Sequence, residues 1–149
     1  MGTLFLLIFL GLGGNIFVPA HAKSKPRGGQ NYYVDAQNGD DRDDGKSEKT
    51  AWKSLLRTKE LQLRAGSLLL RRNSSFNGLL EVSAEGKAGR PVVIGAYGTG
   101  RKPCIQAPDS SLYTVLVRNS DYLTLENLEV VNTGKQRMAN RTGVKVLCE

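Results

Sequence analysis

The clearest pattern of apolar and polar positions begins at Leu123, which alternates with polar residues through Leu125. This period of two residues predicts a strand with one buried face. The pattern then shifts by one position, and Leu128 and Val130 become the inward pair. A shift of one residue turns buried side chains toward water unless the backbone bends. We therefore predict two short strands joined by a corner at Asn127.

Beyond residue 61 the chain consists mainly of short apolar segments separated by Gly, Pro, Asn and Ser. Many short strands are typical of a sandwich, a barrel or a solenoid. Asn77-Gly78 predicts one local hairpin, but such signals are otherwise rare. The strands between Val115 and Val146 fall in threes, so we expect coils that stack and bury their inward side chains. The predicted strands are Tyr32–Val34, Leu68–Leu70, Leu79–Val82, Val92–Ala96, Cys104–Gln106, Val115–Val117, Leu123–Leu125, Leu128–Val131 and Val144–Val146.

A helix is predicted before most of these strands, at about Ala51–Glu60. Thr50 is suited to cap it, and Trp52, Leu55 and Leu56 lie on one face at i, i+3 and i+4. We interpret Trp52 as an anchor in the core, with a sugar-stacking platform as the alternative.

Residues 1–22 are predicted to be a secretory signal peptide. The apolar run Leu4–Leu12 is too short to cross a bilayer, and Ala20-His21-Ala22 supplies small residues at a cleavage site. A short membrane anchor is the alternative. We expect residues 23–31 to be a linker and residues 32–149 to form the folded domain. This domain is expected outside the cytoplasm, secreted or periplasmic, with no stable membrane span after signal removal.

Removal of this segment also removes His21, the only histidine of the chain. A mature chain without histidine excludes a Ser-His-Asp mechanism and zinc held by His ligands. For Cys104 and Cys148, a disulfide and two buried thiols both stay open. Any chemistry must therefore come from carboxylates, Lys, Arg or Tyr, and the catalytic residues stay unassigned.

The formal net charge of +7 favours an anionic partner. For an exported chain we expect an acidic polysaccharide and no nucleic acid, because the sequence has no helical basic stripe and no interleaving of aromatic and basic residues. A basic surface without a polyanionic partner is the alternative. The candidate contacts to an acidic glycan are Arg137 and Arg141, in the polar segment Gly134–Thr142, and Lys145 on the next strand.

Two carboxylates, Glu126 and Glu129, point outward on the strands that flank the predicted corner. A glycosidase needs two carboxyl groups facing one glycosidic bond. The corner is expected to place these two on different faces, so we interpret them as surface residues.

The segment Asp35–Gly45 is acidic and rich in glycine, and it is predicted to be a loop. Calcium takes several oxygen ligands from such loops. An EF-hand is excluded, because Arg42 and Ala51 fall at two of its ligand positions. Asp side chains that accept hydrogen bonds within turns are the alternative explanation. The calcium candidates are Asp40, Asp41, Asp43 and Asp44, and no other cofactor is predicted.

Several segments follow one another in an order that is typical of one group of proteins. Tyr32-Tyr-Val-Asp35, Asn38-Gly-Asp40 and Thr50-Ala-Trp-Lys-Ser-Leu55 look like a first strand, an acidic loop and a capping helix. Later strands and one full coil are matched by Leu63–Leu70, Gly86–Gly98, Lys102–Ile105 and Asn119–Asn132. The chain thereby resembles the N-terminal part of secreted right-handed parallel β-helix proteins, the pectate-lyase-like group. Ser67, where the group often has Asp, and Cys104, where an aliphatic residue is usual, depart from its pattern.

The resemblance implies an all-β fold, a right-handed parallel β-helix fragment with a short N-terminal capping helix. It also implies a polysaccharide-active enzyme, either a lyase with a Lys or Arg base and calcium or a glycosidase with paired carboxylates, acting on a pectate- or alginate-like polymer. Because the group's catalytic residues generally lie on later coils, we expect an active site mostly beyond residue 149, a chain truncated at its C-terminus, and no activity in this fragment alone. A noncatalytic carbohydrate-binding or adhesive β-helix and a nonfunctional truncated product are the alternatives.

Overall fold

The structure of the chain is a computed structural model that describes residues 29–149. The predicted signal peptide and most of the predicted linker lie outside the described residues. Within residues 29–149 the chain forms eleven strands and two short 3-10 helices, so the predicted all-β class is confirmed. No helix in this range combines the length and the apolar character that a bilayer span requires.

The first strand begins at Gln30, inside the predicted linker, and every predicted strand is present with boundaries that shift by a few residues at most. The strands are β1 (Gln30–Val34), β2 (Gln62–Leu63), β3 (Gly66–Arg71), β4 (Ser75–Asn77), β5 (Leu80–Glu85), β6 (Val92–Tyr97), β7 (Cys104–Gln106), β8 (Val115–Asp121), β9 (Leu123–Leu125), β10 (Glu129–Val131) and β11 (Val144–Leu147), and the helices are η1 (Glu48–Thr50) and η2 (Leu55–Glu60).

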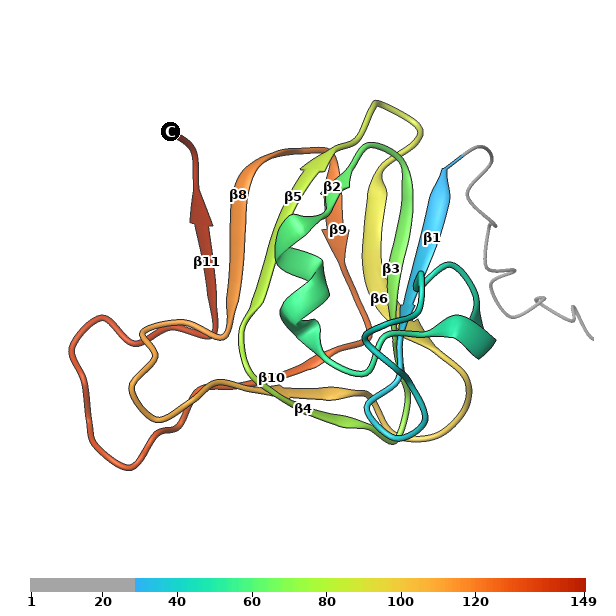
Figure 1. The fold of residues 1–149 in the computed structure, drawn as a ribbon. Helices are drawn as coiled ribbons and strands as arrows, with labels where there is room; N and C mark the ends of the chain where they lie inside the picture. The colour runs from blue at the N-terminus through green and yellow to red at the C-terminus, as the bar shows by residue number, and fades with distance from the viewer. Residues whose placement is uncertain (1–28) are drawn as a thin grey trace, which may run out of the picture.

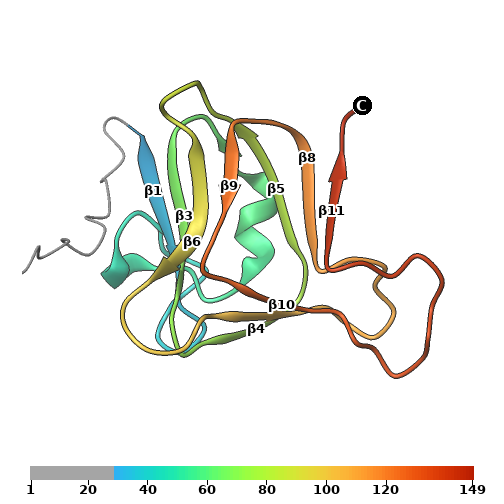
Figure 2. The same cartoon turned by 180° about the vertical axis from the view of Figure 1, so that it is seen from behind.

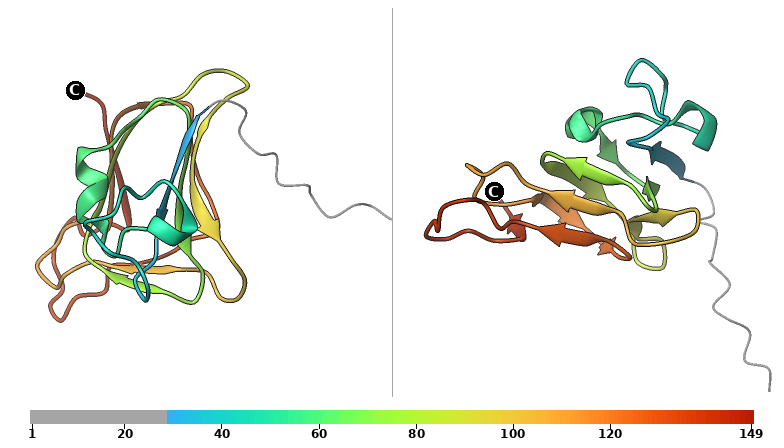
Figure 3. Two further views of the ribbon diagram at one scale, coloured as in Figure 1. Left: turned by 45° about the vertical axis from the view of Figure 1, so that its right-hand side comes forward. Right: turned by 90° about the horizontal axis from the view of Figure 1, so that it is seen from below.

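The strands form three parallel sheets around one interior (Figures 1 and 2). Their strand orders are β1-β3-β6-β9, β10-β7-β4 and β11-β8-β5-β2. From β3 onward the chain passes through the three sheets three times in the same sequence: first sheet, second sheet, third sheet. Figure 3 shows these passages lying one behind another, with the helices at one end and the last strands at the other.

Register places apolar residues of successive passages directly beside one another. In the first sheet Tyr32 pairs with Leu68, Leu68 with Ile94, and Ile94 with Leu125. Leu68 and Ile94 are fully buried. Comparable ladders run through the other two sheets, where Phe76, Ile105 and Val130 are neighbours in one, and Leu80, Val115 and Val144 in the other. No single passage can cover its own inward side chains, so burial comes from the stacking of neighbours.

The predicted corner at Asn127 is confirmed. Asn127 has a φ of 58°, a left-handed conformation that Asn adopts more readily than most residues. The strand before the corner belongs to the first sheet and the strand after it to the second. The backbone therefore turns from one sheet to the next without reversing its direction.

The predicted hairpin at Asn77-Gly78 is wrong. β4 and β5, which flank Gly78, belong to different sheets and pair with other passages of the chain. The N–H of Gly78 donates to the carbonyl of Gln106, and the N–H of Leu80 donates to the carbonyl of Thr114. Because the neighbouring passage takes these hydrogen bonds, Asn-Gly makes a corner here and not a two-residue turn.

The predicted helix at Ala51–Glu60 is only partly present, and its predicted cap is wrong. The N–H of Trp52 donates to the carbonyl of Tyr33, which pairs this segment with β1 and prevents helix formation at Ala51 and Trp52. The helix η2 starts at Leu55, and the Ser54 side chain caps it by accepting the N–H of Leu56. Trp52 itself is buried and belongs to the core cluster, so its interpretation as a core anchor is confirmed.

The two ends of the stack differ. At the first end Trp52 and Leu55 are buried over the interior. At the other end β9, β10 and β11 are edge strands, and Leu125 is 37% and Val146 63% exposed. Leu125 had been predicted as an inward core residue, but no further strand pairs with β9 among the described residues, so much of its side chain stays uncovered.

Candidate functional site

A polar pocket lies at the carboxyl ends of β3 and β6, and residues of η1 and of the loop that follows β1 also line it. Arg71 ends β3 and Tyr97 ends β6, and these two residues are register partners. Parallel pairing brings them to the same edge of the sheet although they lie far apart in the sequence. The pocket has a volume of about 270 Å³ and is lined by Gln37, Glu48, Arg71, Arg72, Asn73, Tyr97, Gly98 and Thr99.

The ion pair beneath this pocket is formed by Asp35 and Arg71. The Nη1 of Arg71 donates to the Oδ2 of Asp35 at 3.1 Å, and Asp35 is only 1% exposed. Asp35 also accepts the N–H groups of Gln37 and Asn38, at 2.9 and 3.2 Å, and the side-chain amide of Asn38. Burial raises the pKa of this carboxyl, but these hydrogen bonds and the charge of Arg71 outweigh it and lower the pKa. Asp35 is therefore an anion that fixes the loop after β1 to the end of β3.

The hydroxyl group of Tyr97 is the exceptional feature of the pocket. The residue is 6% exposed, and its hydroxyl oxygen is buried without a hydrogen-bond partner among the described residues. Its ring packs edge-on against Tyr33, with the ring centroids 5.3 Å apart. Burial and the charge of Asp35 raise the pKa of Tyr97 to about 12, although the nearby guanidinium of Arg71 acts in the opposite direction. The phenol therefore stays protonated at neutral pH and can donate one hydrogen bond.

Hydrogen bonds hold the rim of the pocket in place. The side-chain amide of Gln37 donates to the carbonyl of Asn73 at 3.0 Å, and the amide of Asn73 donates to the carbonyl of Thr99 at 3.1 Å. Arg72 donates through Nη1 to the carbonyl of Gly100 at 3.1 Å. These side chains, from two segments of the chain, thus have fixed positions against each other and against the backbone at Thr99 and Gly100, and the site is suited to binding a small polar molecule.

The sequence pattern did not single out these pocket residues. Arg71-Arg72-Asn73 follows one buried apolar strand, and Tyr97-Gly98 follows the next. Polar side chains at the ends of neighbouring parallel strands come together at one edge of the sheet. Sequence can predict such a site only when the register of β3 and β6 is known.

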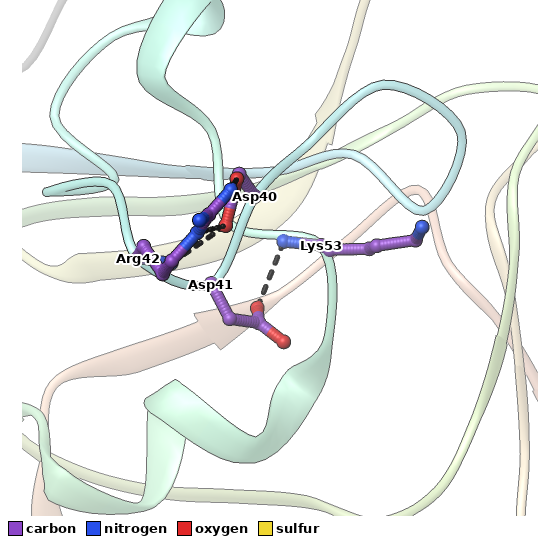
Figure 4. Close-up of polar contacts among 4 residues, drawn as sticks. All are labelled: Asp40, Asp41, Arg42 and Lys53. Atoms are coloured by element: carbon purple, nitrogen blue, oxygen red, sulfur yellow. Dashed lines mark hydrogen bonds and ion pairs between the residues drawn. The ribbon is translucent and has the colours of Figure 1, made fainter.

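Two carboxylates of the acidic loop, those of Asp40 and Asp41, accept hydrogen bonds from other residues (Figure 4). Asp40 pairs with the guanidinium of Arg42, with Nη2 and Oδ2 2.6 Å apart. These hydrogen bonds from Arg42 lower the pKa of Asp40 to about 2. The Oδ1 of Asp41 accepts the backbone N–H groups of Lys53 and Ser54, at 2.9 and 2.8 Å.

The two other calcium candidates, Asp43 and Asp44, also accept hydrogen bonds from other residues of this region. Asp44 accepts the N–H of Lys46 and the hydroxyl of Thr50, which lowers its pKa. The backbone carbonyl of Asp43 accepts the indole N–H of Trp52 at 2.8 Å. Within residues 29–149 no three His, Cys, Asp or Glu side chains are arranged to hold a metal ion. Hydrogen bonds in this region therefore account for the side chains of Asp40, Asp41 and Asp44, and calcium binding stays a prediction from the sequence.

Calcium that binds the acidic loop is expected to raise the Tm of the chain, because a cation that binds the folded state stabilises it. The rise is expected to be small, because the cation would first have to displace the hydrogen bonds to Asp40 and Asp41. Thermal unfolding followed by circular dichroism, with calcium chloride or with EDTA, measures this directly. A saturable rise in Tm with calcium, absent with magnesium, would establish a site in the loop.

The structure separates the predicted glycan contacts. Arg137 is exposed in the long connection between β10 and β11, and Lys145 is exposed on β11. Arg141 is half-buried and donates to the side chain of Asn132 at 2.9 Å and to the carbonyl of Asp109 at 2.6 Å. Arg141 therefore braces this connection, and contact of the three residues with a glycan stays a prediction.

The two remaining glutamates considered for catalysis and the two cysteines lie apart from the polar pocket. Glu126 follows β9 in the first sheet and Glu129 lies in β10 of the second, so they lie on different faces as predicted. Cys104 in β7 is half-buried, and burial raises the pKa of its thiol. Cys148 is exposed after β11, and neither cysteine forms a disulfide.

Comparison with known proteins gives matches to one kind of enzyme. No protein-family model matches the chain. The chain is 30% identical over 132 residues to a lacto-N-biosidase of Bifidobacterium longum subsp. longum, covering 70% of this chain and 8% of that protein. It is also similar to the crystal structure of the GH136 lacto-N-biosidase from Eubacterium ramulus. The selenomethionine derivative gives a TM-score of 0.63 at 30% identity, covering 78% of this chain and 24% of that one. The native protein gives 0.59 at 32% identity, covering 71% and 21%.

These matches correct the resemblance to the pectate-lyase-like group, which is wrong. The similar proteins are lacto-N-biosidases, and the chain spans less than a quarter of the length of each. The segments behind that resemblance are strands, corners and the acidic loop, whose residues satisfy backbone geometry and burial. Such requirements are shared by any chain that stacks short parallel strands, so they did not distinguish between families.

Proposed function

We propose that this chain is part of a glycoside hydrolase that acts on an oligosaccharide containing lacto-N-biose. The observation that carries the proposal is the agreement of sequence and structure. A match at 30% identity with a TM-score of 0.63 over 78% of the chain leads to a lacto-N-biosidase, as does the separate sequence match. The comparisons give no support to an acidic polysaccharide, because the relatives are named for lacto-N-biose. We also propose that residues 1–22 are a signal peptide that directs export of the chain.

In this proposal each passage of the chain through the three sheets is one coil of a right-handed parallel β-helix, and the three sheets are its faces. The chain visits the sheets in one repeated order, and parallel connections in proteins are almost always right-handed. The partly exposed apolar side chains of β9, β10 and β11 would then pack against a further coil. Val146, 63% exposed beside the buried Val117, is the position where such a coil would bury most.

The described part of the chain contributes binding and scaffold, and we assign no catalytic pair to it. Hydrolysis of a glycosidic bond uses two carboxyl groups roughly 5–10 Å apart on either side of that bond. Asp35, Asp40 and Asp41 are engaged in internal hydrogen bonds, and Glu126 and Glu129 lie on different sheets. In this proposal the reacting carboxylates come from outside residues 29–149.

The test is hydrolysis by the full gene product that carries this chain. The protein is incubated with p-nitrophenyl lacto-N-bioside, and release of p-nitrophenol is followed by absorbance. We expect hydrolysis of this substrate and none of polygalacturonate or alginate. Binding of the saccharide without hydrolysis would favour a noncatalytic carbohydrate-binding protein. Cleavage of the acidic polymers, with formation of unsaturated uronates, would contradict the proposal.

A further inference from the structure

We infer that the pocket at the ends of β3 and β6 binds a single uncharged sugar residue. The choice of a sugar rests on the proposed function, whereas the site rests on the geometry of Arg71, Tyr97 and their neighbours.

The charges around the pocket favour an uncharged ligand. Arg71 is neutralised by the buried Asp35, to which it donates at 3.1 Å. Arg72 on the rim is opposed by Glu48, which lines the same pocket. The two cations are thus matched by two anions. A phosphate or a carboxylate would gain little net attraction here, and a polyol with both donors and acceptors fits better.

The Tyr97 hydroxyl is the group that points to a ligand. Buried polar groups in folded proteins are almost always hydrogen-bonded, and each exception needs an explanation. Here the hydroxyl oxygen is buried and has no hydrogen-bond partner of good geometry within residues 29–149, and the residue lines the pocket. The guanidinium of Arg71 lies near this hydroxyl, but Arg is only a donor and cannot accept the phenol O–H. A sugar hydroxyl can both donate to and accept from a phenol. A ligand at this position would therefore supply the acceptor that the described residues do not provide.

The volume of the pocket limits the size of the ligand, and its rim is already held by hydrogen bonds. Pockets for drug-sized molecules measure about 300–1,000 Å³. A volume of about 270 Å³ is below this range and suits one monosaccharide unit. The hydrogen bonds of Gln37, Asn73 and Arg72 already fix the rim, so binding costs little additional ordering.

The experiment is an NMR titration of the full chain with galactose, N-acetylglucosamine, lacto-N-biose and, separately, inorganic phosphate. We expect a sugar to bind with a Kd on the order of millimolar, a range typical of weak binding. Tyr97→Phe removes only the hydroxyl and is expected to weaken binding at least about fivefold, the loss of one hydrogen bond. Tyr113→Phe, outside the pocket, is the matched control and should leave binding unchanged.

Three results would overturn the inference: binding of phosphate in preference to every sugar, no binding of any sugar, or sugar binding that Tyr97→Phe leaves unchanged. Because its hydroxyl makes no hydrogen bond of good geometry to the described residues, Tyr97→Phe should fold, which circular dichroism verifies before titration. The hydrolysis assay on the full gene product is scored separately. Sugar binding at Tyr97 without hydrolysis would remove the proposed function and keep the site, and hydrolysis without such binding would do the reverse.

Discussion

Leu68→Asp is expected to abolish soluble folding of the chain. Leu68 lies in the centre of the first sheet, is fully buried, and pairs with Tyr32 on one side and Ile94 on the other. An ionised carboxylate at this position has no partner, and burying it costs several kcal/mol, a large part of the roughly 5–15 kcal/mol that stabilises a domain. Soluble yield and the circular dichroism spectrum measure the outcome.

Leu125→Asp is the matched control in the same ladder. Leu125 pairs with Ile94, but it lies on the edge strand β9 and is 37% exposed. Its carboxylate can reach water, so we expect a folded chain whose free energy of unfolding is reduced by about 1–2 kcal/mol. If Leu125→Asp destabilised the chain as much as Leu68→Asp, the difference in exposure between these two side chains in the structure would be contradicted.

Asp35→Ala is expected to lower the free energy of unfolding by about 2–3 kcal/mol. The substitution leaves the N–H groups of Gln37 and Asn38 without their acceptor and removes the partner of Arg71. Arg71 is 42% exposed, so solvent screens its charge and the hydrogen bonds to the loop make up most of the loss. Urea unfolding followed by tryptophan fluorescence measures it.

The control for Asp35 is Asp109→Ala. Asp109 pairs with Lys135 at 3.6 Å, and both side chains are largely exposed. We expect a change within about 0.5 kcal/mol, as for other surface ion pairs. A loss at Asp109 as large as that at Asp35 would contradict the role given to the buried carboxylate.

The pH dependence of stability follows from the same residue. The pKa of Asp35 is lower in the folded chain than its ordinary value of 3.8. Its stabilising contribution is therefore complete above the ordinary pKa and is lost as the pH falls through the lower pKa of the folded state. We expect acid unfolding of the wild-type chain to include this loss, and Asp35→Asn to show a smaller change in stability below about pH 4. An unchanged acid profile in Asp35→Asn would assign the loss to other carboxylates.

Sequence predicted the elements whose structure depends on a few neighbouring residues. The alternation at Leu123 and Leu125 and the left-handed corner at Asn127 depend on a few neighbouring residues, and both are present. The strand boundaries also follow the apolar segments closely. Asn77-Gly78 failed as a hairpin because Gln106, in the neighbouring passage of the chain, takes the hydrogen bond of Gly78.

Features that depend on long-range pairing could not be predicted. The helix was placed too early because Trp52 exchanges hydrogen bonds with the strand β1, where Tyr33 accepts and Asp35 donates. The polar pocket was missed for a similar reason. Arg71 and Tyr97 become neighbours only through the parallel register of β3 and β6, which the apolar pattern does not specify.

Three parallel sheets enclose one core, which is covered at the end near Trp52 and uncovered at β9, β10 and β11. Amide hydrogen exchange of the chain, measured for each strand, tests this arrangement. Local opening is easiest where few buried contacts hold a segment, so we expect slow exchange in β3, β5, β6 and β8 and fast exchange in β9, β10 and β11. Exchange in β9–β11 as slow as in β3 and β6, or unprotected amides in β3 and β6, would contradict it.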